Sequence, residues 1–256
     1  MKNALFVGLL ILSFACQSTK EEKIKVNGKT YQLSFSDEFN QSSLNEKKWQ
    51  YRTDSKHWST QLPENVQVSD GLLHLRGQKE KSGGKDYTGA GIISIDTFQY
   101  GYYEVRMKIP KGAGWHTSFW LMNHDGTGGT GSTAATIEID ICENDSKNSN
   151  GYSVNLHKWK GGHVDMKGMY IPTANLAEDF HLFSCEYTPD YVKYYFDNKE
   201  VRTIDIKDLP QGSVNIWITT IASYLDNTKA VDESQLPVSA IVDYVRFYKH
   251  VGSSNK

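Results

Sequence analysis

Residues 101–109 read Gly-Tyr-Tyr-Glu-Val-Arg-Met-Lys-Ile, and this stretch decides the fold class. Apolar or aromatic side chains occupy every second position from Tyr103 to Ile109, with Glu, Arg and Lys between them. A period of two indicates a β-strand with one buried face. Residues 192–204 show the same alternation on both sides of Asp197-Asn198-Lys199, so we expect a β-hairpin there.

Other short apolar runs continue along the chain and bring the candidate strands to about a dozen. They cover Gly71–Arg76, Gly91–Ser94, Ser118–Met122, Thr136–Ile141, Val154–His157, Val214–Ile221 and Ile241–Tyr248. Helical periodicity is confined to a few expected turns, for example over Ser42–Lys47. Many short strands, 21 Gly and no linker within residues 25–250 predict one all-β domain, a β-sandwich.

The composition argues against nucleic-acid partners and against several non-globular classes of protein. The chain has 256 residues, with 28 Lys and Arg against 30 Asp and Glu and a formal net charge of −2. Nucleic-acid binding is not expected, because it normally needs a basic surface. The 15 Tyr, 10 Phe and 6 Trp argue against disorder, coiled coil and collagen. Beyond Cys16, only Cys142 and Cys185 are present, and whether they pair is left open.

The N-terminus has the features of a targeting segment. Lys2 precedes an apolar run at Ala4–Phe14, which would span about 16 Å as a helix, half of a bilayer core. Ala15-Cys16 resembles the processing site of bacterial lipoproteins. We expect a signal peptide over residues 1–15, lipidation of Cys16 and a polar tether over residues 16–26. The protein would be exported and held at the outer membrane or cell surface by lipid alone. A plain secretory peptide with a periplasmic or secreted product is the alternative.

Three acids lie within residues 136–143, Thr-Ile-Glu-Ile-Asp-Ile-Cys-Glu. Alternating isoleucines mark one face of a strand, which places Glu138 and Asp140 on the other face. Glu143 follows Glu138 by an odd number of residues, so a regular strand would turn it to the isoleucine face. A one-residue β-bulge near Ile141-Cys142 would return it to the face of the other two acids.

This constellation points to glycoside hydrolysis. Two carboxyls about 5–5.5 Å apart are what a retaining mechanism requires, one attacking the anomeric carbon and the other protonating the leaving oxygen. Asp140 between them can hydrogen-bond the nucleophile and, by its negative charge, help to keep the acid protonated. The alternative is a solvated edge strand with chance carboxylates.

The acid strand resembles the bulged Glu-x-Asp-x-x-Glu signature of glycoside hydrolase family 16. Further segments in the order and spacing of that family are 35–39, 70–75, 100–106, 114–122 and 242–248. The resemblance covers nearly the whole chain after the targeting segment. It implies a concanavalin-like jelly-roll β-sandwich with a substrate cleft across its concave face.

The resemblance also implies roles and boundaries. Residues 27–250 would form the catalytic domain and residues 251–256 a C-terminal tail. Glu138 would be the nucleophile, Asp140 its helper and Glu143 the general acid/base of a retaining endo-β-glycosidase. The chemistry would need no cofactor or metal, and a structural calcium ion near Asp243, as in some members of the family, is left open.

Several residues are candidates for sugar binding. By the resemblance, Trp115 and Trp120 line the cleft, where an indole face can stack on a sugar; core packing is the alternative. Trp58 lies in a polar loop and would suit an outer subsite. Asn155 and His157 share one face of a strand and would line the same cleft, although His157 could instead be structural.

The sequence favours one substrate class. Ser-Val-Asn-Leu-His at residues 153–157 resembles a strand of the galactan-cleaving branches, the agarases, porphyranases and carrageenases. Glucan-cleaving branches usually carry Trp-Pro, and Gly before the first catalytic Glu, where this chain has Trp115-His116 and Ile137. We therefore expect an enzyme acting on a β-galactan-type polysaccharide. Separately, we expect a monomer. A β-1,3 or mixed-linkage glucanase is the first alternative, and a non-catalytic surface glycan-binding lipoprotein is the second.

Overall fold

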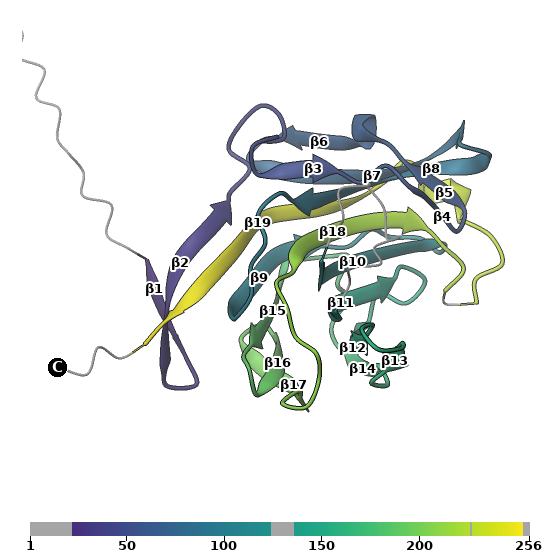
Figure 1. The fold of residues 1–256 in the computed structure, drawn as a ribbon. Helices are drawn as coiled ribbons and strands as arrows, with labels where there is room; N and C mark the ends of the chain where they lie inside the picture. Colours follow the sequence, from purple (N-terminus) through teal and green to yellow (C-terminus); the bar gives the residue numbers. More distant parts are fainter. Residues whose placement is uncertain (1–21, 124–135, 226, 253–256) are drawn as a thin grey trace, which may run out of the picture.

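The computed structural model describes residues 22–123, 136–225 and 227–252, and these form an all-β sandwich, as predicted (Figure 1). The first strands are β1 (Lys23–Val26), β2 (Lys29–Asp37), β3 (Trp49–Tyr51), β4 (Ser55–Lys56), β5 (Ser59–Gln61), β6 (Val66–Ser69), β7 (Leu72–Ser82), β8 (Lys85–Ser94) and β9 (Gly101–Lys108). The others are β10 (Trp115–Met122), β11 (Ile137–Asp145), β12 (Gly151–Lys158), β13 (Val164–Asp165), β14 (Met169–Pro172), β15 (His181–Tyr187), β16 (Tyr191–Phe196), β17 (Lys199–Asp205), β18 (Asn215–Ala222) and β19 (Val238–Val251).

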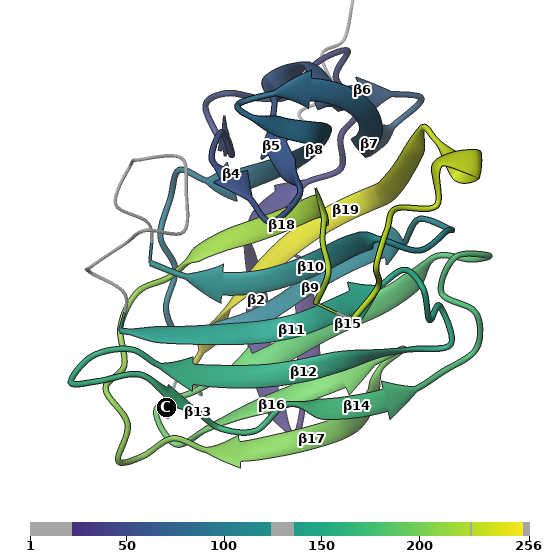
Figure 2. The ribbon, with the colours of Figure 1, turned by 90° about the vertical axis from the view of Figure 1, so that its right-hand side faces the viewer.

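The strands form two curved layers that face each other. One layer, the cleft sheet, has the order β3-β8-β18-β10-β11-β12-β14, and its antiparallel strands are seen face-on in Figure 2. The other, the back sheet, has the order β2-β19-β9-β15-β16-β17. Pairing of β7 with both β19 and β8 joins the layers at one edge.

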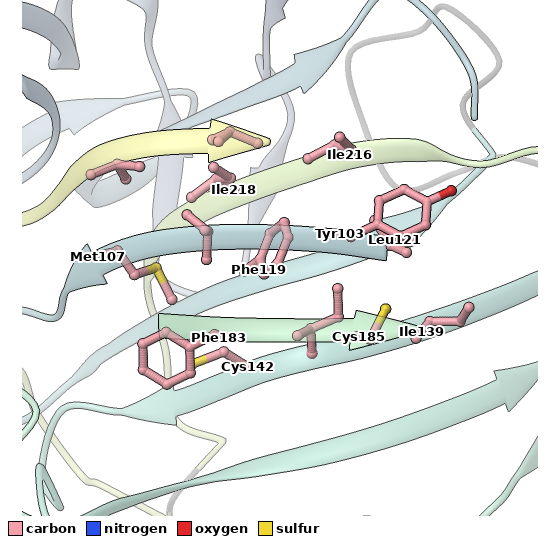
Figure 3. Packing of buried hydrophobic residues seen from close by; sticks show 14 of the residues in the cluster. Tyr103, Met107, Phe119, Leu121, Ile139, Cys142, Phe183, Cys185, Ile216 and Ile218 are labelled. Atoms are coloured by element: carbon pink, nitrogen blue, oxygen red, sulfur yellow. The ribbon is translucent and has the colours of Figure 1, made fainter. Parts of the chain in front are cut away.

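Apolar side chains fill the space between the layers (Figure 3). Phe119 and Leu121 of β10 and Ile139 of β11 point inward from the cleft sheet and are completely buried. Because strand side chains alternate, the residues between them point outward to the cleft. Cys142 and Cys185 are both buried free thiols, so they do not form a disulfide with each other.

The local predictions are confirmed at one turn and wrong at another. Asp197 and Asn198 both have positive φ values, 46° and 65°, and connect β16 to β17 as the expected tight hairpin. Ser42–Lys47 forms bends and a turn closed by backbone bonds to the Asn45 carbonyl, and it is not helical. The short 3₁₀ turns of the described chain lie instead at Pro63–Asn65 and Glu233–Gln235.

The ends of the domain extend beyond their predicted positions. Residues 23–26, expected to be the end of the tether, form β1 and pair with β2. At the other end β19 continues to Val251. Residues 1–15 and Cys16 lie outside the described residues. Among the residues that are described, no helix is long and apolar enough to cross a membrane.

Candidate active site

The predicted β-bulge is present in β11. Asp140 pairs with Asn155 of β12 and Glu143 pairs with Ser153, so three steps on β11 oppose two on β12. On the other side of β11, Phe119 and Trp120 of β10 pair with Cys142 and Asp140, so Ile141 has no partner residue in β10. The extra residue gives Glu143 the same face as Glu138 and Asp140, and all three carboxyls line one pocket of the cleft sheet.

The pocket has a volume of about 210 Å³ and is built mainly from the outward faces of neighbouring strands. Its walls also include Arg52, Lys56, His57, His116, Ser118, Trp120, Met122, Trp159, Thr219, Ile221 and Leu225. Four basic side chains and three carboxyls therefore share one small space. Charges in such a space influence one another strongly because little water screens them.

Glu138 is held by a tryptophan. Nε1 of Trp159, just past the end of β12, donates a 2.6 Å hydrogen bond to Oε2 of Glu138. Burial, the largest cause, together with the charge of Glu143, keeps the pKa of Glu138 above its ordinary value, although the charge of His157 and the bond from Trp159 act to lower it. The two neighbours therefore favour the ionised carboxylate that burial alone would disfavour.

Asp140 is the most buried of the three acids, with 3% of its surface exposed. Burial, followed by the charges of Glu143 and Glu138, raises its pKa well above the ordinary value. Nε2 of His157 lies 3.3 Å from its Oδ2. Burial lowers the pKa of His157, but the bond to Asp140 and the surrounding acids raise it to about 9. The two groups therefore hold a proton between them.

Glu143 has a histidine neighbour. Nε2 of His116 lies 3.5 Å from Oε1 of Glu143, and Nδ1 of the same ring lies 2.9 Å from Oδ1 of Asp145. Burial lowers the pKa of His116, but its bonds to Asp145 and Glu143 raise it to about 10. His116 is thus a buried imidazolium between two acids.

The two tryptophans predicted to line the cleft differ in position. Trp120 lines the pocket and stacks on Trp217, with ring centroids 4.5 Å apart. Trp115 does not line it: the ring is 1% exposed and packs with Ala222 and Val231 beneath the cleft sheet. The two tryptophans lie five positions apart, an odd number, and β10 has no bulge in its pairing with β18. Their side chains therefore point to opposite faces of the sheet.

The other predicted sugar-binding residues lie near the acids or beside them. His157 contacts Asp140 directly, and Nδ2 of Asn155, a residue that is 8% exposed, lies 3.1 Å from Nε2 of His157. Trp58 is half-buried and lines a neighbouring pocket together with Tyr87. That pocket adjoins the first one through His57, which lines both.

The sequence did not single out Trp159 or His116 as neighbours of the carboxyls. His116 could have been found, because it lies two and four residues before Ser118 and Trp120 on the same face of β10. Trp159 follows the end of a strand, where no periodicity predicts the direction of a side chain.

The predicted calcium position does not assemble a side-chain site. Asp243 of β19 forms a 2.5 Å ion pair with Arg106 of β9. In the part of the chain that the structure describes, no group of three or more His, Cys, Asp or Glu side chains could hold a metal ion. The residues around Asp243 therefore do not fit calcium through side chains alone.

Comparison with known proteins identifies the family. Residues 30–250 match the family model described as beta-porphyranase A-D, GH16 domain. The chain belongs to glycoside hydrolase family 16. This family 16 chain is 26% identical over 246 residues to a beta-glucanase of Rhodothermus marinus, covering 86% of both proteins. It is 28% identical over 243 residues to a keratan-sulfate endo-1,4-beta-galactosidase of Sphingobacterium multivorum, covering 86% of this chain and 55% of that protein.

A solved structure gives the same result. LamAcat of Zobellia galactanivorans has a TM-score of 0.76 and 26% identity, covering 85% of this chain and 97% of that one. The predicted family 16 jelly-roll fold is confirmed, and the protein is a retaining endo-β-glycanase whose chemistry needs no cofactor. Relatives named beta-glucanase and keratan-sulfate endo-1,4-beta-galactosidase both occur, so family membership alone leaves the sugar open.

Proposed function

We propose that the protein hydrolyses internal β-linkages of a galactose-containing polysaccharide, with Glu138 as nucleophile and Glu143 as general acid/base. The observation that carries this proposal is the bulge of β11, which presents both glutamates and Asp140 in one pocket. Bulges beside active sites commonly re-aim side chains in this way.

The chemistry proceeds in two displacements. A carboxylate oxygen of Glu138 attacks the anomeric carbon while Glu143 passes its proton to the glycosidic oxygen, so that bond breaks and a glycosyl ester forms. Glu143 then takes a proton from water, whose oxygen attacks the same carbon and releases Glu138. Two inversions leave the configuration retained.

The neighbours of the glutamates assist these steps. Trp159 and His157 favour the ionised form of Glu138 that the attack needs. His157, whose pKa is raised to about 9, lies 3.3 Å from Asp140, so its positive charge offsets part of the negative charge that the sequence led us to expect from Asp140.

Three observations support a β-galactan substrate. The matching family model is that of porphyranases, and one relative is a keratan-sulfate galactosidase. Asn155 and His157 lie beside Asp140, where the galactan-type motif predicts polar side chains. Trp115-His116 also replaces the Trp-Pro that is usual in glucan-cleaving branches, and His116 lines the pocket.

A glucan substrate is the second candidate. Several relatives are beta-glucanases, including one that is 31% identical over 195 residues. Trp120 stacked on Trp217 offers an apolar platform that does not by itself distinguish galactose from glucose.

A reducing-end assay on a polysaccharide panel tests the proposal. The panel comprises agarose, porphyran, carrageenans, keratan-type chains, laminarin and mixed-linkage glucan, each with wild type and Glu138→Gln. We expect oligosaccharides from one galactan and none with the variant, which should still fold and bind that galactan. Release from laminarin alone would favour the glucanase, and full activity of Glu138→Gln would refute the assigned roles.

We also propose that the protein is an exported lipoprotein anchored through Cys16. The support is the apolar run before Ala15-Cys16 and the polar residues after it. Labelling of cells with radioactive palmitate should mark the wild type and not Cys16→Ser. Equal labelling of both would refute the anchor.

A further inference from the structure

His116 stands out because it connects one carboxyl of the site to an acid outside it. It belongs to β10, and both its partners, Glu143 and Asp145, belong to β11. The two acids are two residues apart on one strand, so they reach the same ring from one side. Asp145 does not line the pocket, whereas His116 and Glu143 do.

We propose that His116, held by Asp145, is a cationic positioning residue that orients the Glu143 carboxyl for proton transfer. The inference rests on the proposed role of Glu143 as general acid/base. No reacting atom touches His116; it acts through Glu143 alone.

The geometry fixes the orientation of the ring. Nδ1 faces Asp145 at 2.9 Å, and a histidine held at that nitrogen presents Nε2 in a defined direction, here toward Glu143 at 3.5 Å. The ring is 6% exposed, so solvent cannot replace either contact. A rotamer of Glu143 that keeps this contact is therefore favoured over one pointing to solvent.

The charge of His116 is maintained by its surroundings. Its bonds to Asp145 and Glu143 keep its pKa raised, against the effect of burial. Lys56 of β4, Arg52 between β3 and β4, and His57 line the same pocket as His116, and the charge of His116 acts on His57. The strand on its other side, β18, places Ile221 opposite it and carries no titratable residue.

A second histidine of the pocket shows the contrast. Burial, then the charges of Lys56, His116 and Arg52, lower the pKa of His57 to about 4. Nδ1 of His57 contacts the hydroxyl of Ser223 and no acid. At neutral pH, His57 is therefore neutral and His116 is charged, although both line the same pocket. The difference arises because only His116 has acid partners, Glu143 and Asp145.

The expected effect concerns the rate of the chemical step. General acid/base catalysis needs the Glu143 carboxyl within hydrogen-bond reach of the glycosidic oxygen, and the contact with His116 favours one rotamer of that carboxyl. His116→Gln removes the imidazole that makes this contact. We expect kcat to fall about ten-fold while KM stays near the wild-type value.

The test uses His116→Gln and Asp145→Asn in the full chain, with porphyran, or whichever panel polysaccharide the wild type cleaves, as substrate. Both variants should lower kcat and leave KM near the wild-type value, because Asp145→Asn removes the anion that holds the ring of His116. His181→Gln is the matched control, since His181 forms a 2.9 Å pair with Asp197 away from the pocket. A wild-type kcat in His116→Gln, or a rise in KM with kcat unchanged, would overturn the proposal.

A second measurement does not depend on activity. ¹⁵N-histidine NMR should show His116 protonated on both nitrogens at pH 8 in the wild type and deprotonating at lower pH in Asp145→Asn. A neutral His116 at pH 7 would overturn the inference. Glu143→Gln separates the two failures. Full activity of that variant refutes the proposed function, whereas an inactive Glu143→Gln together with a wild-type kcat in His116→Gln refutes only the role of His116.

Discussion

Nε1 of Trp159 donates a 2.6 Å hydrogen bond to Oε2 of Glu138, so a side chain just beyond a strand reaches the carboxyl proposed as nucleophile. The indole is 39% exposed and lines the pocket, and it stacks on His163 with ring centroids 4.2 Å apart. His163 in turn contacts His157, the partner of Asp140. The segment from His157 to His163 therefore contacts two carboxyls, those of Glu138 and Asp140.

Trp159→Phe should weaken this support while keeping an aromatic face. Loss of a hydrogen bond to a charged group is expected to lower kcat/KM about ten-fold. Because the bond lowers the pKa of Glu138, its loss raises that pKa, and the acid limb of the pH–rate profile should move to higher pH. The profile of kcat/KM from pH 4 to 8 measures both. An unchanged acid limb would show that the indole only contacts sugar.

Trp115 is expected to affect stability rather than substrate binding. Its ring is buried against Val231, and truncation to alanine should cost about 3 kcal/mol or more in the free energy of unfolding. Urea denaturation measures that loss, and KM of the folded enzyme should stay near the wild-type value. Gly77→Ala is a companion variant, because a Cβ there would lie 2.3 Å from the ring of Trp115. A large rise in KM for Trp115→Ala, without loss of stability, would contradict the observed packing.

The same rule that located the acids could have excluded Trp115. Alternation predicted the bulge at Ile141-Cys142 from the parity of Glu143, and the register of β11 confirms it. Applied to β10, it separates Trp115 from Trp120, which are also an odd number of residues apart. The cleft position of Trp115 was implied by the family resemblance, and the spacing of the two tryptophans contradicts it.

Other parts of the site depend on contacts that periodicity does not encode. The pairing of His116 with Asp145 follows from the register between β10 and β11, which is set by the whole sheet. Trp159 lies past the end of β12, and its direction follows from backbone bonds to the Thr136 carbonyl. Sequence patterns predict faces of strands well and the positions of loop side chains poorly.

His57 predicts how stability depends on pH. Its folded-state pKa of about 4, lowered chiefly by burial, lies below the unfolded value of about 6.5. Between these values the unfolded chain binds a proton that the folded chain does not, so this contribution to stability is present above pH 6.5 and lost as the pH falls toward 4. His57→Asn should therefore lose less free energy of unfolding than wild type between pH 7 and 4.5. Asparagine suits the positive φ of 51° at this position, and urea denaturation makes the comparison. Equal losses in both proteins would contradict the burial of His57.

Chemical rescue distinguishes the two glutamates. Glu143→Gln lacks the base that activates water, so the glycosyl ester on Glu138 should persist on substrates with good leaving groups. Azide needs no base, and it should restore turnover by attacking that ester, giving a glycosyl azide with retained configuration. In Glu138→Ala no ester forms, and azide bound in the space left by the carboxylate would attack once and give the inverted product. NMR of the products assigns the configuration directly. A glycosyl azide of inverted configuration from Glu143→Gln would mean that the two roles are exchanged. Inversion requires a single displacement, and only removal of the residue that forms the ester leaves a single displacement.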